Sequence, residues 1–389
     1  MLNTPKEEGA PRRILHVVDD FSTANTGVTA TVRQMAQWQA RHCDWVGVHA
    51  TGPVDLPAPE GVHLLQVEAH SYSPRWRYPS HGVQGLLQLA HEHTVTHLHV
   101  HEFWRGGFVS GMLAARSAGL PVLLSAHGST APWALHAQGM AKDWKKRIYW
   151  QAFGRFLLGP DVVLHAITPL EQRHMAAFFG RQPQAVIPNA IDLQGMLAAP
   201  AKPRRRRFVF LGRLHPVKGV DMLIEAFGRA RLAPGWELLL AGPEEIPAYA
   251  RALKSLAAAS PSAAHIRFAG PVHGPDKVDL LTDAWAVVVP SRTEVIGMVN
   301  LEAAALATPT ITTRNTGLEE WESAGGMLVA DDAQSLAQAL EECAAWSEQE
   351  QLQRGRRSQA HVAQIYSLEA VGQQWLRLYD SMQKDGSSN

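Results

Sequence analysis

Short apolar segments alternate with longer amphipathic segments along most of the chain. In the first half, β-branched and apolar runs of strand length stand at residues 14–18, 45–49, 97–101, 122–125 and 162–167. Segments with the apolar spacing of helices lie between them, at residues 29–41, 107–118 and 142–156. Because parallel strands need crossover connections, this order predicts an α/β domain whose mostly parallel sheet is covered on both faces.

The same alternation returns in the second half. Its predicted strands are residues 208–211, 237–241, 266–269, 286–290, 310–313 and 326–329. Before them, residues 199–207 read Ala-Pro-Ala-Lys-Pro followed by four arginines, which predicts a linker. Near the end, residues 368–382 carry apolar side chains at helical spacing and predict an amphipathic helix.

These patterns predict two domains, as the length of 389 residues also does. We place an N-terminal domain at residues 1–198, the linker at 199–207 and a C-terminal domain at 208–366. Residues 367–389 form a last helix, expected to pack back on the N-terminal domain, and a tail. In sheets of this kind, ligands bind at the carboxyl ends of the strands.

Charge and cysteine content exclude several classes of protein. Lys and Arg together number 36, and Asp and Glu also number 36, so no nucleic-acid partner is expected. Cys43 and Cys343 lack the spacing of a disulfide framework or zinc site. Without a recognisable signal peptide or membrane-spanning segment, we expect a cytoplasmic protein.

Two charged loops in the second half carry candidate chemistry. The first follows residues 208–211 and holds Gly212, Arg213, Lys218 and Gly219. Glycines permit close approach of a ligand to the backbone, and two cations five residues apart can clamp a diphosphate. Taken alone, either cation is more simply a solvated residue of a turn.

The second loop carries Glu294 and Glu302, separated by seven residues. The alanine- and leucine-rich run 300–307 predicts a helix with Glu302 in its first turn and Glu294 on the loop before it. The N-terminus of such a helix favours an anion such as a diphosphate. The two carboxylates then suit sugar and ribose hydroxyls, although Glu302 alone also fits a residue that stabilises the helix dipole.

In this order, these motifs resemble those of the GT-B retaining glycosyltransferases of family 4 type, the glycosyl transferases group 1. The motifs are Gly212-Arg213, Lys218-Gly219, Gly242-Pro243, residues 268–272 (Phe-Ala-Gly-Pro-Val) and the glutamate pair. The resemblance implies a GT-B fold, with two Rossmann-like domains facing each other across a cleft. It also implies a retaining, metal-independent transferase that needs no cofactor and uses a UDP- or GDP-sugar as its donor.

Residue roles follow from the resemblance position by position. Arg213 and Lys218 would hold the donor diphosphate and stabilise the leaving nucleotide. Glu302 would bind the ribose hydroxyls and Glu294 the transferred sugar. The remaining donor-binding positions that the resemblance implies are Gly212, Pro271, Val272, Ile296, Gly297, Met298 and Val299. Of these, Pro271 and Val272 would lie beside the nucleobase, and Ile296 replaces the Phe that is more usual in relatives.

In the N-terminal half the resemblance points to two places. Gly27 stands in the loop after the first strand, where relatives carry a Gly-Gly pair. His127, within Ser-Ala-His-Gly-Ser at residues 125–129, matches a histidine that relatives place near the anomeric centre, and we expect it to be catalytic together with Glu294, Arg213 and Lys218. For His99 and His101 a core position is the better interpretation.

Residues 142–150 combine a basic cluster with aromatic residues at helical spacing. This pattern fits a helix that touches anionic lipid at the inner face of the cytoplasmic membrane. It fits equally well a solvated helix whose aromatic residues face the core. Residues 75–78 (Arg-Trp-Arg-Tyr) are a shorter segment of the same kind. We correspondingly expect the acceptor to be a saccharide or lipid-linked saccharide, and the protein to act in cell-surface polysaccharide biosynthesis.

Three other functions compete with the transferase. A sugar-nucleotide epimerase on the same fold would bind the same donor, but the glutamate pair favours a transferase. A dinucleotide-dependent oxidoreductase is opposed by the lack of Gly-x-Gly-x-x-Gly after residues 14–18. A non-catalytic nucleotide-sugar binding protein is the third. No Asp-x-Asp triplet occurs to hold a metal ion.

Overall fold

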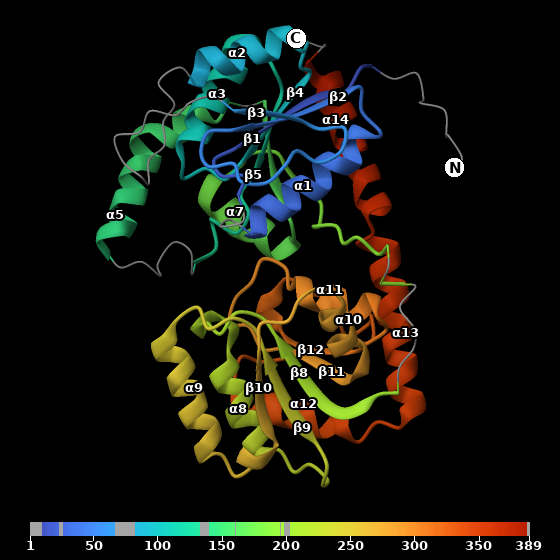
Figure 1. Cartoon of the computed structure of the whole chain (residues 1–389). Helices are drawn as coiled ribbons and strands as arrows, with labels where there is room; N and C mark the ends of the chain where they lie inside the picture. The colour runs from blue at the N-terminus through green and yellow to red at the C-terminus, as the bar shows by residue number, and fades with distance from the viewer. Residues whose placement is uncertain are drawn as a thin grey trace. The chain divides into compact units, whose positions relative to one another are not determined.

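The computed structural model describes residues 10–22, 26–66, 82–132, 140–159, 161–194, 196–197 and 203–386 (Figure 1). The chain divides into two compact units. The N-terminal unit comprises Met1–Ala190 together with Leu368–Asn389, and the C-terminal unit comprises Ile191–Ser367. The predicted boundaries were residues 198 and 367, so the N-terminal unit ends earlier in the structure than the sequence pattern indicated.

A seven-stranded sheet forms the centre of the N-terminal unit, in the order β3-β2-β1-β4-β5-β6-β7. Its strands are β1 (Arg13–Val18), β2 (Trp45–Ala50), β3 (His63–Gln66), β4 (His97–His101), β5 (Val122–Ser125), β6 (Val162–Ala166) and β7 (Gln184–Val186). Every pairing is parallel. The five predicted strands are confirmed, whereas the short edge strands β3 and β7 were not predicted.

Helices cover both faces of this sheet. They are α1 (Thr26–Ala40), α2 (Gly82–Glu92), α3 (Gly106–Ala118), α5 (Met140–Tyr149), α6 (Arg155–Leu157), α7 (Pro169–Phe179) and α14 (Leu368–Gly386). Side chains of α2, α3 and α7 share one buried cluster with the sheet, and those of α1 and α14 share another. A π-helical turn at Trp150–Gly154 separates α5 from α6, so the single helix predicted at 142–156 is interrupted.

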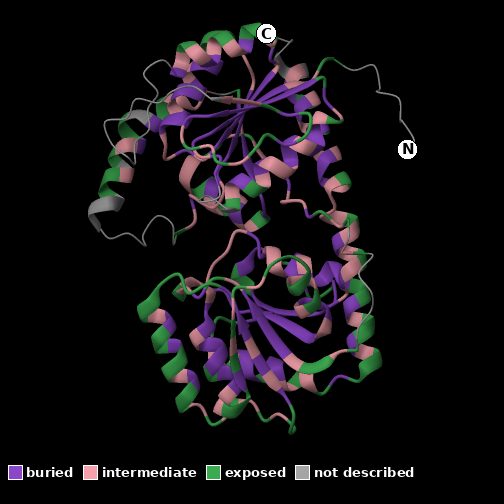
Figure 2. Cartoon of the chain, in the orientation of Figure 1, coloured by how far each residue is buried: buried purple, intermediate pink, exposed green. Residues whose placement is uncertain are grey.

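The C-terminal unit contains a six-stranded sheet in the order β10-β9-β8-β11-β12-β13. Its strands are β8 (Arg205–Leu211), β9 (Glu237–Ala241), β10 (Ile266–Gly270), β11 (Ala284–Val289), β12 (Thr310–Thr313) and β13 (Met327–Val329). All of them pair in parallel. All six strands predicted for the second half are confirmed, and in both units the central strands of the sheet are deeply buried (Figure 2).

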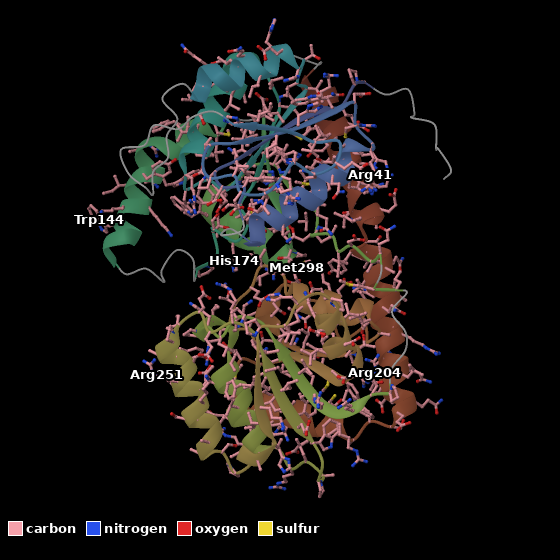
Figure 3. All side chains as sticks on the ribbon, viewed as in Figure 1. Arg41, Trp144, His174, Arg204, Arg251 and Met298 are labelled. Atoms are coloured by element: carbon pink, nitrogen blue, oxygen red, sulfur yellow. The ribbon has the colours of Figure 1, made fainter. Side chains whose placement is uncertain are left out.

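The predicted linker, residues 199–207, is too long at its C-terminal end. Strand β8 begins at Arg205, and Arg207 within it pairs with Glu237 at 2.9 Å. Arg204, labelled in Figure 3, donates hydrogen bonds to the carbonyl oxygens of Leu306 (3.2 Å) and Ala307 (2.9 Å). Arg204, Arg205 and Arg207 of the arginine run therefore contribute specific contacts to this unit, because each of these guanidinium groups finds an acceptor.

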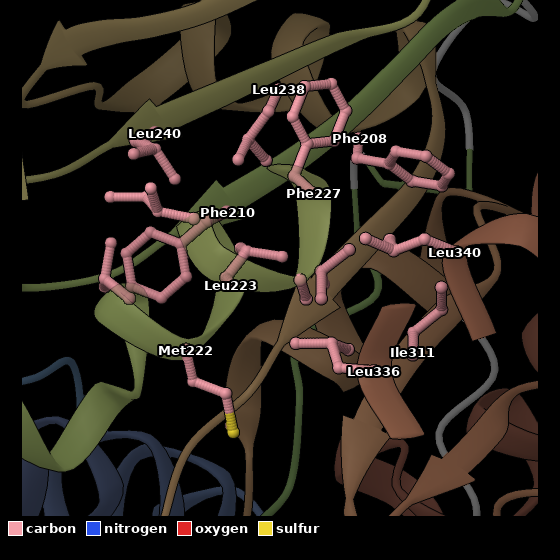
Figure 4. Packing of buried hydrophobic residues seen from close by; sticks show 14 of the residues in the cluster. Phe208, Phe210, Met222, Leu223, Phe227, Leu238, Leu240, Ile311, Leu336 and Leu340 are labelled. Carbon is pink, nitrogen blue, oxygen red and sulfur yellow. The ribbon is translucent and has the colours of Figure 1, made fainter. Parts of the chain in front are cut away.

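The helices of the C-terminal unit also lie on both faces of the sheet. They are α8 (Val220–Arg229), α9 (Pro247–Ala259), α10 (Gly274–Asp283), α11 (Met298–Ala305), α12 (Ala333–Ala344) and α13 (Glu348–Ile365), with short 3-10 turns η2 (Pro216–Lys218), η3 (Ala263–His265) and η4 (Arg314–Thr316). Phe208, Phe210, Leu223, Leu238 and Leu340 interdigitate in the larger core cluster (Figure 4). Among the described residues, no helix combines the length and hydrophobicity that a membrane crossing requires.

Candidate active site

Three glycines bring backbones together at the carboxyl ends of β8, β9 and β10. The N–H of Gly212 donates to Ala241 O at 2.9 Å, and the N–H of Gly242 donates to Gly270 O at 2.8 Å. Gly242 has a φ of +145°, and a Cβ atom there would stand 1.8 Å from Gly212 O. Only glycine fits at position 242, because any side chain there would collide with the backbone of Gly212.

Lys218 and Glu294 meet at the same edge. Lys218 ends η2, Glu294 follows β11, and the Lys218 ammonium forms an ion pair with Glu294 Oε1. Ser291 Oγ donates to the same carboxylate oxygen at 2.6 Å. The adjacent Gly219 has a φ of +65°, and a Cβ atom there would stand 2.1 Å from Pro290 O. The two loops therefore touch, which places a cation beside a carboxylate.

A second ion pair fastens these loops to each other. Arg292 Nη2 lies 2.8 Å from Asp221 Oδ2, and the Arg292 N–H donates to Val217 O at 2.8 Å. Burial alone would raise the pKa of Asp221, but hydrogen bonds from Arg292 and Tyr249 outweigh it and lower that pKa. The Arg292 contact could not be predicted from the sequence, because residues 71 positions apart meet only in the fold.

Arg213 and Glu302 also have oppositely charged partners that the sequence did not reveal. Arg213 Nη1 lies 2.7 Å from both carboxylate oxygens of Glu245, and Lys277 Nζ lies 2.7 Å from Glu302 Oε2. The Arg213 and Glu245 side chains are 55% and 40% exposed, so their pair contributes about 1 kcal/mol at most. Arg213 is therefore easily released to another anion.

Helix α11 begins beside this cluster. Met298, labelled in Figure 3, is its first residue, and the preceding Gly297 provides no side-chain cap. The helix starts two residues earlier than residue 300, so the prediction that Glu302 lies in the first turn is wrong. The first turn carries no acidic residue and no side-chain cap, so its positive dipole end favours an anion. The N–H groups of Met298 and Asn300 already donate to Ile296 O and Gly297 O.

His127 follows β5 in the N-terminal unit. It adopts a left-handed backbone with a φ of +49°, and Gly128 after it has a φ of +80°. The buried carboxylate of Glu171 holds this turn by accepting the N–H groups of Gly128 at 2.5 Å and Ile167 at 2.7 Å. Burial lowers the pKa of His127 to about 3, so its imidazole is neutral at physiological pH.

Comparison with known proteins agrees with this geometry. Residues 26–190 match the family described as Glycosyl transferase 4-like domain, and residues 205–345 match the family described as Glycosyl transferases group 1. The chain belongs to these glycosyltransferases. It is 28% identical to the D-inositol 3-phosphate glycosyltransferase of Kineococcus radiotolerans over 74% of each chain. It is also 29% identical to the D-inositol 3-phosphate glycosyltransferase of Segniliparus rotundus. That alignment covers 60% of this chain and 55% of the relative.

Solved structures show that the fold of this glycosyltransferase is GT-B. HepE from Anabaena, crystallised in complex with UDP and glucose, aligns with a TM-score of 0.71 at 18% identity. That alignment covers 95% of this chain and 100% of the HepE chain.

The remaining positions that were predicted to bind the donor lie near the same strand ends. Val272, after β10, and Val299, in the first turn of α11, pack against one buried cluster. Pro271 is exposed and Ile296 is buried. A side chain at Gly297 would place its Cβ atom 2.4 Å from Asn300 Nδ2, so this position requires glycine.

Gly27 was predicted to lie in a loop, but it lies in the first turn of α1. It has no positive φ, and a Cβ atom there would meet nothing within 4 Å. The local structure therefore gives no steric reason for glycine at this position.

His99 and His101 are buried in β4, which confirms the interpretation that they belong to the core. Within the described parts of the chain, they form with His16 a group whose ligating nitrogens lie within 4.8 Å of one another. Such a spacing can hold a metal ion, but the ring nitrogens of all three residues already take part in hydrogen bonds. Cys43 and Cys343 are both buried.

In the basic and aromatic segment 142–150, some side chains pack inside the protein and others are exposed to solvent. In α5, Trp144 is 69% exposed and Ile148, one turn later, is 50% exposed (Figure 3). Trp150 is buried against Phe178 with 5.0 Å between ring centroids, and Lys146 lies over the Trp104 ring. One face of the segment packs and the other presents apolar side chains to solvent. The segment 75–78 lies outside the described residues.

Proposed function

We propose that this glycosyltransferase moves a sugar from a UDP- or GDP-sugar, with retention at the anomeric carbon and without a metal ion, to a saccharide or lipid-linked saccharide acceptor. Cell-surface polysaccharide biosynthesis is the pathway class that we propose. The observation that carries the donor assignment is the ion pair of Lys218 with Glu294 beside the uncapped start of α11.

The charges of the ligand-free site suit a donor that has both a diphosphate and hydroxyl groups. A diphosphate entering at α11 would attract Lys218 and Arg213, whose present partners are carboxylates. Glu294 and Glu302 would then accept hydrogen bonds from the sugar and ribose hydroxyls. The carboxylates thus hold the cations near the strand ends until a donor binds.

In the proposed reaction, the bond between the anomeric carbon and the diphosphate oxygen breaks while the acceptor oxygen bonds to the same face of that carbon. The acceptor proton passes to the departing diphosphate. Positive charge from Lys218, Arg213 and the start of α11 stabilises the negative charge that develops on the leaving group. The chain's own groups supply this stabilisation, which supports a metal-independent reaction.

A thermal-shift screen of UDP, GDP, ADP and their common sugar conjugates, without added metal, tests the donor assignment. We expect the melting temperature to rise with one nucleotide family, because a ligand that binds only the folded state stabilises it. Glu302→Ala should reduce this shift, since the ribose would lose an acceptor. An exposed control, Glu319→Ala, should not. If a well-folded preparation shows no shift with any nucleotide, the donor site is misassigned.

We also propose that α5 contacts anionic lipid, because Trp144 and Ile148 are exposed beside a basic cluster. Replacing Lys145, Lys146 and Arg147 together by Ser should weaken sedimentation with liposomes that contain phosphatidylglycerol. About 1 kcal/mol is expected for each basic residue near an anionic surface, so binding should fall by at least tenfold. Equal sedimentation of both proteins would remove the membrane proposal.

A further inference from the structure

Five histidines gather beneath the carboxyl ends of the central strands in the N-terminal unit. They are His16 in β1, His99 and His101 in β4, His127 after β5, and His165 in β6. All but His127 are completely or almost completely buried, and His127 lines a small pocket with Asn189 and Trp375. Their ring nitrogens join other polar groups in one continuous chain of hydrogen bonds.

The first part of this chain begins at a backbone carbonyl. Ile187 O lies 2.7 Å from His165 Nε2, and His165 Nδ1 lies 2.7 Å from Ser125 Oγ. Ser125 Oγ in turn lies 2.7 Å from His99 Nε2, and His99 Nδ1 lies 3.0 Å from the hydroxyl of Tyr379, which α14 contributes. Each group uses one polar atom toward the preceding group and one toward the next.

The second part continues from Tyr379 to His127. The Tyr379 hydroxyl lies 3.2 Å from Gln39 Nε2, and Gln39 Oε1 lies 2.8 Å from His16 Nε2. His16 Nδ1 lies 3.0 Å from His101 Nε2, and His101 Nδ1 lies 2.9 Å from His127 Nε2. The chain ends there, because no hydrogen bond within the described residues involves His127 Nδ1.

The carbonyl oxygen of Ile187 determines which atoms carry hydrogen in the first part of the chain. A carbonyl can only accept, so His165 Nε2 must donate to it, and a neutral His165 then accepts at Nδ1. Ser125 must therefore donate to His165 and accept from His99 Nε2. His99 is left with Nδ1 as an acceptor, which requires the Tyr379 hydroxyl to donate to it.

Gln39 carries this direction of hydrogen-bond donation from Tyr379 toward His127. Because Tyr379 donates to His99, its oxygen accepts from the Gln39 amide, which directs Gln39 Oε1 toward His16. His16 Nε2 then donates to Gln39, His101 Nε2 donates to His16, and His127 Nε2 donates to His101. The reversed arrangement would place two lone pairs against each other at Ile187.

We propose that this one-directional chain fixes His127 as the tautomer with hydrogen on Nε2, and that its bare Nδ1 accepts a hydrogen bond from a hydroxyl of the bound sugar. Gln39 and Tyr379 are positioning residues in this scheme, since they act on the sugar only through His127. The role of Nδ1 toward sugar rests on the proposed function, whereas the tautomer itself does not.

Neutral histidines are a condition of the scheme, because a cationic ring would donate from both nitrogens. Burial lowers the pKa values of His16 and His165 to about 4, and it lowers those of His99 and His101 well below the ordinary value. Lone pairs and hydrogens then match along the whole chain, so the cluster is satisfied without a metal ion.

Nitrogen NMR of the ligand-free, full-length protein with ¹⁵N-labelled histidine tests the tautomer. His127→Gln identifies the His127 signals. We expect a pyridine-like resonance for His127 Nδ1 and a pyrrole-like resonance for Nε2 near neutral pH. Two averaged resonances, the opposite assignment, or signals that change when zinc is removed with a chelator would overturn the proposal.

Tyr379→Phe tests whether the direction is transmitted through the chain. The loss of one hydroxyl leaves Gln39 free to reverse its amide, so the two tautomers of His127 should become similarly populated and its resonances should average. Ser125→Ala breaks the chain at another link and should have the same effect if Tyr379→Phe does not fold. Tyr366→Phe, in the C-terminal unit, is the matched control and should leave the His127 signals unchanged.

Kinetic measurements distinguish a failure of this proposal from a failure of the proposed function. With half of His127 in the competent tautomer, kcat/KM of Tyr379→Phe should fall about twofold. If the His127 signals are unchanged in both variants, the proposal that the chain transmits the direction of hydrogen bonding to His127 is wrong. If the wild-type protein shows the expected tautomer but transfers no sugar from any nucleotide donor, the tautomer is supported and only the proposed function fails.

Discussion

The N-terminal unit is expected to lose most of its stability between pH 6.5 and pH 5, while the C-terminal unit stays folded. Six histidines of the N-terminal unit are responsible, and burial lowers the pKa of each. They are His16, His49, His99, His101, His127 and His165. Below the ordinary pKa near 6.5, the unfolded chain takes up protons that the native unit does not.

The sign and size of this effect follow from proton linkage. The unfolded state binds more protons than the native state, so the free energy of unfolding falls as pH falls, and it levels off below the native pKa values near 4. At pH 5.5 each histidine that stays neutral in the native state removes roughly 1 kcal/mol, and six together remove several kcal/mol. Since a domain is stable by about 5–15 kcal/mol, this loss approaches its whole stability.

Urea unfolding between pH 8 and pH 5, with hydrogen exchange to assign each transition to a unit, measures the effect. His49→Leu is an informative variant, because both ring nitrogens of His49 are buried and have no hydrogen-bond partner among the residues that the structure describes. It should reduce the pH dependence by about one proton without lowering stability at pH 8. The exposed His265→Gln is the control. If both units lose stability equally on acidification, the histidine explanation is wrong.

Lys218→Ala is expected to lower kcat/KM for sugar transfer at least about a hundredfold, comparable with the loss of one oxyanion donor. The reason is electrostatic, because Lys218 is 22% exposed, lies beside the start of α11, and would face the charge that develops on the diphosphate. Removing a fixed cation from a partly buried site affects the transition state more than the ground state. Steady-state kinetics with the donor found by thermal shift measure the change.

Glu245→Ala is the matched control for this measurement. It removes the exposed partner of Arg213 and leaves both proposed diphosphate ligands in place. Because exposed ion pairs contribute about 1 kcal/mol at most, kcat/KM should change less than about fivefold. Melting temperatures of both variants check that the fold is intact. A Lys218→Ala enzyme within fivefold of the wild type would contradict the diphosphate role of this residue.

The strand pattern was predictable because buried parallel strands are continuous runs of apolar and β-branched residues. The elements that were missed lack this signal. Strand β3 reads His-Leu-Leu-Gln, and β7 has three residues at the sheet edge. The start of β8 was not predicted for another reason, since Arg205 and Arg207 pair with carboxylates from distant parts of the chain. Local polarity does not reveal such partners.

Within the candidate site, sequence motifs located the charged loops but not their contacts. Arg213 and Glu302 were predicted from the motifs, whereas their ion-pair partners Glu245 and Lys277 lie outside any motif. The histidine chain could likewise not be predicted from the sequence. In β4 the alternation His-Leu-His-Val-His suggests one polar face, but α14, more than 260 positions later in the sequence, covers that face with Trp375 and Tyr379.

The return of the chain to the N-terminal unit has a consequence for biosynthesis. Ile191 and Ser367 pair in a parallel bridge, so the C-terminal unit begins and ends at one place and is contiguous in sequence. On the ribosome it can be completed while α14 is still inside the exit tunnel. The N-terminal unit, although translated first, lacks Trp375 and Tyr379 until α14 leaves the exit tunnel. The half of the enzyme that is made first is therefore the half that is finished last.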